Sequence, residues 1–216
     1  MSIQDIVYEI KTNSYYILEN YLDKDICKTI VKHLKSMIMH KNDCGNGEGN
    51  DIRLPNYQKY SKIANNFLND ELIINVGSQY LGYSLLEVHK RCQGGYLKYE
   101  QNKTNCSGGS WHVDCHDKQF KALLYLTDVN ENNGPFSIIQ NSNKNHTNII
   151  ANDSLGKNRD TRYVLKDLEL YYKKKQFKTI IGTAGTCILV DVSNIHRGSI
   201  IKEGERVTLT NYYYPQ

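Results

Sequence analysis

The first third of the chain alternates between helical patterns and loops. Residues 15–22 form a short apolar run that predicts a strand, and Asp23 follows as a side chain suited to cap a helix N-terminus. Apolar residues then recur at helical spacing and predict an amphipathic helix that ends near His40. Two further helices are predicted, one around Ile63 and one that ends at Gly82. The apolar positions of the three helices are Cys27, Ile30, Val31, Leu34, Met37 and Ile38, then Tyr60, Ile63, Ala64 and Phe67, then Leu72, Ile73, Val76 and Tyr80.

A glycine-rich segment separates the first predicted helix from the second. Residues 41–55 contain Gly45, Gly47 and Gly49 among several Asn and Asp residues, and we expect a mobile loop there. Glycines at alternate positions superficially resemble a phosphate-binding loop. No strand is predicted before them and no Lys-Ser/Thr pair follows, so the pattern does not favour a nucleotide site.

From residue 83 onward the pattern changes to short β-prone runs separated by Gly and Asn clusters. Several short strands at this spacing are typical of a sandwich or barrel, so the predicted fold class is mainly β with flanking helices. We expect one domain over residues 1–216, in which residues 1–82 form a helical support and residues 83–216 the β core. The predicted strands are residues 83–89, 95–99, 119–128, 135–140, 186–192 and 206–214.

A long polar and basic segment interrupts the β pattern at about residues 141–178, with a short helix predicted near residues 167–172. Long connections inside a compact domain are often lids or binding loops, so we predict a lid insertion. Its basic side chains include Arg159 and Arg162, which would favour an anionic substrate if they face inward. A solvated basic surface is the alternative.

Composition and charge narrow the range of functions. Of the 216 residues, 39% are hydrophobic and 23% are charged, a balance that suits one compact core. No apolar run approaches the roughly 18–20 residues that a bilayer requires, and residues 1–13 lack the features of a secretory signal. We therefore expect a cytoplasmic protein without a membrane segment. The net charge of +4 is too small to favour nucleic acid, and six cysteines without a C-x-x-C pair argue against a zinc ribbon or a disulfide framework.

Three residues could bind one metal ion. His112 and Asp114 flank Val113 ahead of a β-prone run, and on an extended backbone their side chains project to the same face. His196 follows the apolar run that ends at Val192 and is the candidate third ligand. Two imidazoles and one carboxylate form a facial triad suited to Fe(II), because three adjacent coordination positions stay free. The competing interpretation is a surface polar pair at His112 and Asp114, and a core histidine at His196.

Arg206 is a candidate anion-binding residue near the third ligand. A symmetric seven-residue loop over residues 198–204 would pair Arg206 with His196 across a hairpin. The guanidinium could then hold a carboxylate with two hydrogen bonds, and Thr208, on the same face, could donate its hydroxyl. A tighter turn is the alternative and would pair Arg206 with Ile201.

The segment around the first two candidate ligands resembles a known enzyme family. Residues 111–144 read WHVDCHDKQFKALLYLTDVNENNGPFSIIQNSNK and carry a His-x-Asp strand, Asp128 and an Asn-Gly-Pro turn. These features are similar to the phytanoyl-CoA dioxygenase-like branch of the 2-oxoglutarate/Fe(II) oxygenases. Residues 140–143 replace that family's Pro-Gly-Ser-His segment and keep only its Ser. Residues 182–213 are similar to the family's distal half, with a metal-binding His and an Arg-x-Ser/Thr pair.

This resemblance implies a double-stranded β-helix, a cupin-like jelly roll, in an oxygenase that uses Fe(II), 2-oxoglutarate and O2. It implies that His112, Asp114 and His196 bind iron. It also implies that Arg206 and Thr208 bind the distal carboxylate of 2-oxoglutarate. Related halogenases have a small residue in place of the carboxylate ligand, so Asp114 favours hydroxylation or another oxidation of a small-molecule substrate.

Weaker candidates surround these residues. Tyr99, Tyr96 and Lys98 could reach the other end of 2-oxoglutarate, although a Tyr in a strand more often serves packing. His116 would be a redundant fourth metal ligand. Trp111 is expected to pack beside the site.

Two other functions are compatible with the sequence. A mononuclear zinc hydrolase could use His112 and Asp114 together with His196 or His116. A cupin-like binding module would keep the barrel without turnover, but three intact candidate ligands argue against it.

Overall fold

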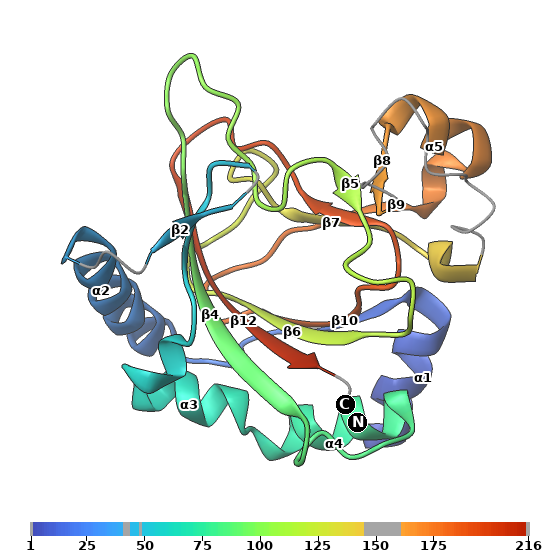
Figure 1. Ribbon diagram of the computed structural model, residues 1–216, viewed down its shortest axis with the longest axis horizontal. Helices are drawn as coiled ribbons and strands as arrows, with labels where there is room; N and C mark the ends of the chain where they lie inside the picture. The colour runs from blue at the N-terminus through green and yellow to red at the C-terminus, as the bar shows by residue number, and fades with distance from the viewer. Residues whose placement is uncertain (1, 41–43, 48, 145–160, 215–216) are drawn as a thin grey trace.

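The computed structural model describes residues 2–40, 44–47, 49–144 and 161–214. Within them two antiparallel sheets face each other, and helices cover the outer face of the larger sheet (Figure 1). The larger sheet consists of β1 (Tyr15–Leu18), β2 (Gly45–Asn46), β3 (Ile52–Leu54), β4 (His89–Lys98), β6 (Phe120–Tyr125), β10 (Cys187–Asp191) and β12 (Glu205–Tyr214). The smaller sheet consists of β5 (Trp111–His112), β7 (Phe136–Ile139), β8 (Arg162–Tyr163), β9 (Phe177–Ile180) and β11 (His196–Gly198).

The strand order of the larger sheet is β1-β10-β6-β12-β4-β3-β2, and that of the smaller sheet is β8-β5-β11-β7-β9. Among the described residues, none of the helices combines the length and apolar character that a bilayer-spanning segment requires. The helices are α1 (Ile3–Asn13), α2 (Lys24–His40), α3 (Lys62–Leu68), α4 (Glu71–Leu81) and α5 (Leu165–Tyr171), with 3-10 turns at Tyr57–Lys59, Ser142–Lys144 and Lys174–Gln176.

Alternation along β12 assigns the two faces of the larger sheet. Val207, Leu209 and Tyr213 are buried in the core between this sheet and the helices. The residues between them face the smaller sheet, because successive side chains of a strand point to opposite sides. A polar row therefore lies between the two sheets, made of Arg206, Thr208, Thr210 and Tyr212.

Several predicted elements are confirmed. The Asp23 side chain caps α2, accepting hydrogen bonds from the backbone N–H groups of Asp25 at 2.8 Å and Ile26 at 3.2 Å. Gly82 ends α4 in the left-handed conformation, with φ 88°. Strands β6, β7, β10 and β12 and helix α5 form within one to three residues of the predicted bounds. Helix α1 was not predicted, and residues 145–160, including Arg159, lie outside the described part of the chain.

The predicted strand at residues 83–89 is wrong. The segment is a loop because it folds back on α4, where the backbone N–H of Leu85 donates to Ser78 Oγ at 2.9 Å. The side chain of Leu85 is fully buried there, against Gly77. Strand β4 begins only at His89 and then continues without a break to Lys98.

The glycine-rich segment is not simply a loop. Its β2 and β3 pair with each other, and β3 adds to β4, with Arg53 opposite Gly95. Part of the predicted lid is also sheet, since β8 pairs with β5 at the edge of the smaller sheet. Both sheets are therefore extended by short strands from segments that read as loops in the sequence.

The predicted hairpin between His196 and Arg206 is wrong, and so is the tighter alternative. Strand β11 lies in the smaller sheet, where His196 faces His112 and Ile138. Strand β12 lies in the larger sheet, where Arg206 faces Leu97. The connecting residues pass from one sheet to the other, so the two side chains face the same interior from opposite walls.

Helix α2 packs on the larger sheet at a glycine, which generates a stability prediction. Leu34 is fully buried, and a Cβ added to Gly94 would lie 2.4 Å from Leu34 Cδ1. Replacing Leu34→Ala leaves a cavity at this contact and should lower the free energy of unfolding by about 2–5 kcal/mol. Urea unfolding followed by circular dichroism measures the change. Met39→Ala, at a position 77% exposed on the same helix, should change it by less than about 0.5 kcal/mol; equal effects would contradict this packing.

Candidate metal centre

Two buried histidines on neighbouring strands form the centre of the site. His112 on β5 and His196 on β11 are register partners, so their side chains project from the same face of the smaller sheet. Their ring centroids lie 4.4 Å apart at an interplanar angle of 52°. The pairing therefore brings together two imidazoles from distant parts of the sequence.

Backbone carbonyls fix the tautomer of each imidazole. His112 Nδ1 lies 2.8 Å from the carbonyl oxygen of Ser110, and His196 Nδ1 lies 2.9 Å from that of Asn194. A carbonyl oxygen only accepts, so each Nδ1 donates its proton and each Nε2 keeps a free lone pair. Burial and the neighbouring His112 lower the pKa of His196 to about 3. His196 is therefore neutral at physiological pH, as a metal ligand must be.

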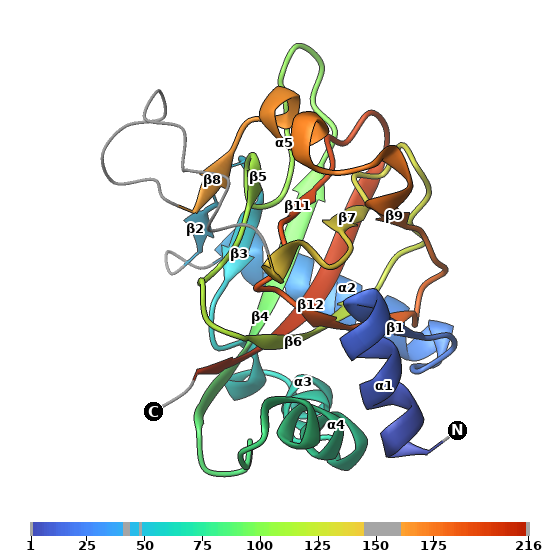
Figure 2. The same ribbon diagram turned by 90° about the vertical axis from the view of Figure 1, so that its right-hand side faces the viewer.

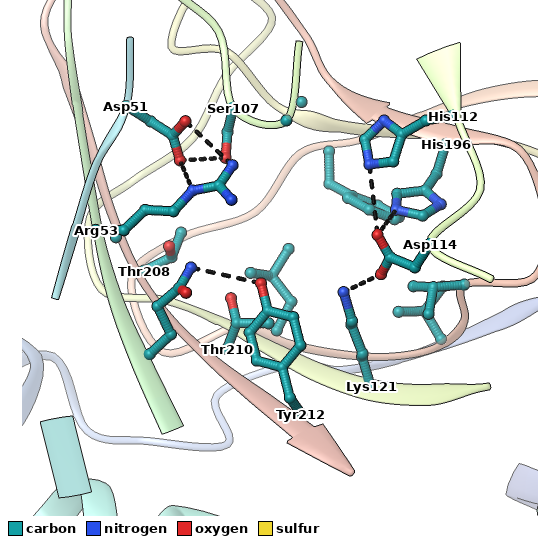
Figure 3. Close-up of a pocket in the computed structure, with 18 of the residues that line it drawn as sticks. Asp51, Arg53, Ser107, His112, Asp114, Lys121, His196, Thr208, Thr210 and Tyr212 are labelled. Carbon is teal, nitrogen blue, oxygen red and sulfur yellow. Dashed lines mark hydrogen bonds and ion pairs between the residues drawn. The ribbon is translucent and has the colours of Figure 1, made fainter. Parts of the chain in front are cut away.

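Asp114 completes a cluster of three ligand atoms (Figure 3). Its Oδ1 lies 3.6 Å from His112 Nε2 and 3.8 Å from His196 Nε2. One ligand atom from each residue lies within 4.8 Å of the other two. Three ligands grouped on one side can hold a metal ion and leave the opposite side open toward the space between the sheets.

Lys121 holds the other oxygen of the Asp114 carboxylate. It extends from β6 of the larger sheet, is 7% exposed, and forms an ion pair with Asp114 Oδ2. Its Nζ also lies 4.0 Å from the ring centroid of Tyr212. Burial opposes ionisation of Asp114, but the positive charge of Lys121 holds the pKa of the carboxyl well below its ordinary value. The ionised carboxylate thus has one oxygen held and one directed at the histidines.

A second buried carboxylate organises the loop that leads to His196. Asp191, at the end of β10, is fully buried and accepts five hydrogen bonds of 2.5–3.1 Å. Because one donor is Asn194, whose carbonyl binds His196, the network supports the orientation of that imidazole. The donors are the Tyr80 hydroxyl, the Asn143 and Asn194 side-chain amides, and the backbone N–H and hydroxyl of Ser193.

A cavity of about 880 Å³, its open mouth included, lies between the sheets beside the three ligands. Arg206 and Thr208 line it from β12, as do Gln93 and Gly95 from β4. A Cβ added to Gly95 would lie 2.7 Å from Thr208 Oγ1, so the missing side chain leaves space above this part of the sheet. The cavity is therefore polar along β4 and β12.

Arg206 is a buried cation without an acidic partner among the described residues. It is 5% exposed, and its Nη1 donates to the carbonyl oxygen of Gly134. Its Nε is buried and has no hydrogen-bond partner in the described part of the chain. Burial lowers the pKa of the guanidinium from its ordinary value. Such a group is suited to receive a carboxylate from a bound molecule.

A polar group that the sequence pattern does not reveal lies on β3 and the loop before it, beside Ser107. Arg53 donates from Nε and Nη2 to Asp51 at 2.8 and 3.2 Å, and the Ser107 hydroxyl donates to Asp51 at 3.0 Å. All three residues line the cavity. The alternation Ile52-Arg53-Leu54 was the available signal, and the surrounding glycines and asparagines obscured it.

The weaker candidates lie outside the cavity. Tyr99 is 41% exposed, because β4 ends at Lys98 and the chain leaves the sheet there. Tyr96 turns to the outer face, where its hydroxyl donates to Glu205 at 3.2 Å. His116 is exposed and is not part of the three-ligand cluster. Trp111 is buried beside the site, edge-on to Phe177 and under Arg197, as its predicted packing role requires.

No family model and no curated protein matches the sequence. Solved structures do match. The epimerase SnoN, in complex with Fe3+, alpha ketoglutarate and nogalamycin RO, is 14% identical with a TM-score of 0.68 over 98% of this chain and 82% of that one. A Pseudomonas putida prolyl-4-hydroxylase is 12% identical with a TM-score of 0.64 over 100% of both chains. HygX from Streptomyces hygroscopicus, with nickel, 2-oxoglutarate and hygromycin B bound, is 14% identical with a TM-score of 0.62 over 99% of this chain and 87% of that one.

These likenesses and the two facing sheets show the fold. The chain is a double-stranded β-helix with flanking helices, as the family resemblance implied, and it shares this fold with 2-oxoglutarate/Fe(II) oxygenases. His112, Asp114 and His196 form a His-Asp-His group between the two sheets that could hold a metal ion.

The Lys121 ion pair predicts how metal binding depends on pH. In the parent protein Asp114 stays ionised well below its ordinary pKa, so its protonation does not compete with a metal at mildly acidic pH. In Lys121→Met, burial acts without the opposing ammonium and raises the pKa of Asp114. The acidic limit of Co(II) binding, followed by visible absorption, should therefore move to higher pH. Lys118→Met is the control, and an unshifted limit in Lys121→Met would contradict the role of Lys121.

Asp191→Asn should loosen the His196 loop. The amide group of Asn would direct its own N–H donors at the N–H and O–H groups that donate to the Asp191 carboxylate, so some of these hydrogen bonds are lost. The loss should lower the free energy of unfolding by about 1–3 kcal/mol. We expect metal affinity to fall about tenfold to hundredfold, the usual effect of losing support behind a ligand. Thermal melts and Co(II) titration measure the two effects. Asp117→Asn, at an exposed position, should leave both unchanged, and wild-type affinity in Asp191→Asn would contradict the network's role.

Proposed function

We propose that this protein is an Fe(II)/2-oxoglutarate-dependent oxygenase of the phytanoyl-CoA dioxygenase-like type, which hydroxylates or otherwise oxidises a small molecule. One observation carries the proposal. The same cavity contains a cluster of three metal-ligand atoms and a buried guanidinium, Arg206, that forms no ion pair among the described residues. A metal ion and a dicarboxylic acid would satisfy both groups at once.

The donor set fits a ferrous ion. Two imidazoles and one ionised carboxylate, from His112, His196 and Asp114, supply two nitrogen ligands and one oxygen ligand. A structural zinc site would be closed by four ligands, whereas the described residues offer three. When bound, the metal and 2-oxoglutarate would together activate O2 for oxidation of a C–H bond.

Residues of β12 fit the distal carboxylate of 2-oxoglutarate. Arg206 and Thr208 are two residues apart and face the cavity from the same side of the strand. Arg206 would donate from its fork of N–H groups and Thr208 from its hydroxyl. Gly95 keeps the neighbouring position on β4 free of a side chain. Apolar side chains from both sheets line other parts of the cavity and would exclude water from it, namely Leu123, Phe136, Val190 and Val192.

The described residues offer no general base for the zinc-hydrolase alternative. Among them, the carboxylate that lines the cavity besides Asp114 is that of Asp51, and it is 3% exposed. Its oxygens accept hydrogen bonds from Arg53 and Ser107. A carboxylate held in this way does not readily take a proton from a bound water.

Anaerobic titration tests the proposed function. Protein loaded with Fe(II) should develop a visible charge-transfer band when 2-oxoglutarate is added, because the co-substrate chelates the metal. Arg206→Gln should raise the concentration of 2-oxoglutarate needed for half-saturation about tenfold to hundredfold, the worth of charge-assisted hydrogen bonds. Admitting O2 should then produce succinate.

Arg197→Gln is the matched control, because Arg197 stacks on Trp111 outside the cavity. It should titrate like the parent protein. A parent protein without a band, or an Arg206→Gln variant with unchanged half-saturation, would contradict the proposal.

A further inference from the structure

Three neutral polar side chains line the cavity without a role in holding the metal or the co-substrate. Gln93 extends from β4, and Thr210 and Tyr212 extend from β12. Strands β4, β6 and β12 lie between the smaller sheet and helices α3 and α4 (Figure 2). Gln93 and Thr210 are register partners, so their side chains are neighbours on the face of the larger sheet that borders the cavity. The proposed function leaves this part of the wall without a ligand.

Three neighbours hold the ring of Tyr212. Lys121, its register partner on β6, has its Nζ 4.0 Å from the ring centroid. The ring of Tyr214 is stacked on it, with centroids 6.2 Å apart and an interplanar angle of 9°. The guanidinium carbon of Arg91 lies 5.0 Å from the centroid. The Tyr212 hydroxyl is thereby fixed next to Gln93, whose Nε2 donates to it at 3.4 Å.

Gln93 and Tyr212 keep hydrogen-bonding groups for a bound molecule. A carboxamide has two N–H donors and an acceptor oxygen, and the bond to Tyr212 uses one of the donors. The second N–H, Oε1 and the Tyr212 O–H have no other hydrogen-bond partner in the described part of the chain. Exchanging the nitrogen and oxygen of the amide would still leave donors and acceptors. Because the two polar groups lie 3.4 Å apart, one bound group can contact both.

The charged groups of the lining already have partners or a proposed ligand. Arg206 would bind the distal carboxylate of 2-oxoglutarate, and Arg162, on the edge strand of the smaller sheet, is not free either. A charge placed beside Gln93 and Tyr212 would therefore find no unpaired opposite charge on this wall, and burying an unpaired charge is costly. The two ion pairs of the lining are Lys121 with Asp114 and Arg53 with Asp51.

From this arrangement, and resting on the proposed function, we infer that the substrate has a neutral group that both donates and accepts hydrogen bonds, a carboxamide or a hydroxyl, and that Gln93 and Tyr212 bind it. A carboxylate only accepts and would repel Gln93 Oε1, whereas an ammonium only donates and would lie near the Lys121 ammonium. Lys121 also joins this subsite to the metal centre, because it contacts both Tyr212 and Asp114 (Figure 3). A substrate bound at the subsite would thus lie beside the metal.

Calorimetry with matched small molecules tests this inference. The anaerobic protein, saturated with Fe(II) and 2-oxoglutarate, is titrated with four probes that share a phenyl ring: benzamide, benzyl alcohol, acetophenone and benzoate. Acetophenone and benzoate accept hydrogen bonds but do not donate them. We expect benzamide or benzyl alcohol to bind about tenfold more tightly than either, and the better of the two identifies the group as an amide or a hydroxyl. The charge-transfer band, recorded in the same samples, detects displacement of 2-oxoglutarate from Arg206.

Tyr212→Phe removes the hydroxyl and keeps the ring beside Lys121, and it should weaken binding of the preferred neutral probe about tenfold. Gln93→Met has a side chain of similar length without the amide and should have the same effect. Tyr214→Phe is the matched control, because it removes a hydroxyl from the stacked ring, which does not line the cavity. It should bind the probe like the parent protein.

Three results would overturn the inference: acetophenone or benzoate binding as tightly as the better neutral probe, wild-type binding of that probe in both Tyr212→Phe and Gln93→Met, or an equal loss in Tyr214→Phe. A missing charge-transfer band would instead refute the proposed function. A parallel titration of the metal-free protein with the same probes measures the subsite alone, so the two failures are distinguishable.

Discussion

The pairing of β5 with β11 is the constraint on which the site depends. It sets His112 opposite His196 in the smaller sheet and buries both rings. Burial keeps the pKa of His196 low, and the backbone carbonyl two residues before each histidine holds its proton on Nδ1. A shift of register by one residue would turn one imidazole to the opposite face, and no cluster would form.

The two sheets divide the chemistry between them. The smaller sheet contributes the imidazoles, and the larger sheet contributes Lys121, Arg206 and Thr208 from its inner face. Helices cover the outer face of the larger sheet and bury its apolar residues there. Between the sheets, an apolar cluster from β6, β7, β9 and β10 fills one part of the space, and polar side chains of β4 and β12 line the cavity beside it.

The sequence predicts the fold class and the ligand triad. It does not predict which sheet positions Arg206 in the cavity. Alternation along residues 206–214 identifies β12, and His-x-Asp spacing identifies one side of the site. Neither reveals that residues 199–204 change sheets, because the sequence pattern of a crossing loop resembles that of a hairpin loop. The roles of Lys121 and Arg53 depend on contacts between segments that are distant in sequence. The local pattern of hydrophobic and polar residues contains no information about such contacts.

Anomalous diffraction from crystals of the protein grown with Mn(II) and 2-oxoglutarate under anaerobic conditions tests the account most directly. It predicts one strong manganese peak within bonding distance of His112 Nε2, His196 Nε2 and Asp114 Oδ1, with Lys121 still on Asp114 Oδ2 and a carboxylate on Arg206. A peak elsewhere, or one at the triad with Arg206 contacting no ligand, would contradict it.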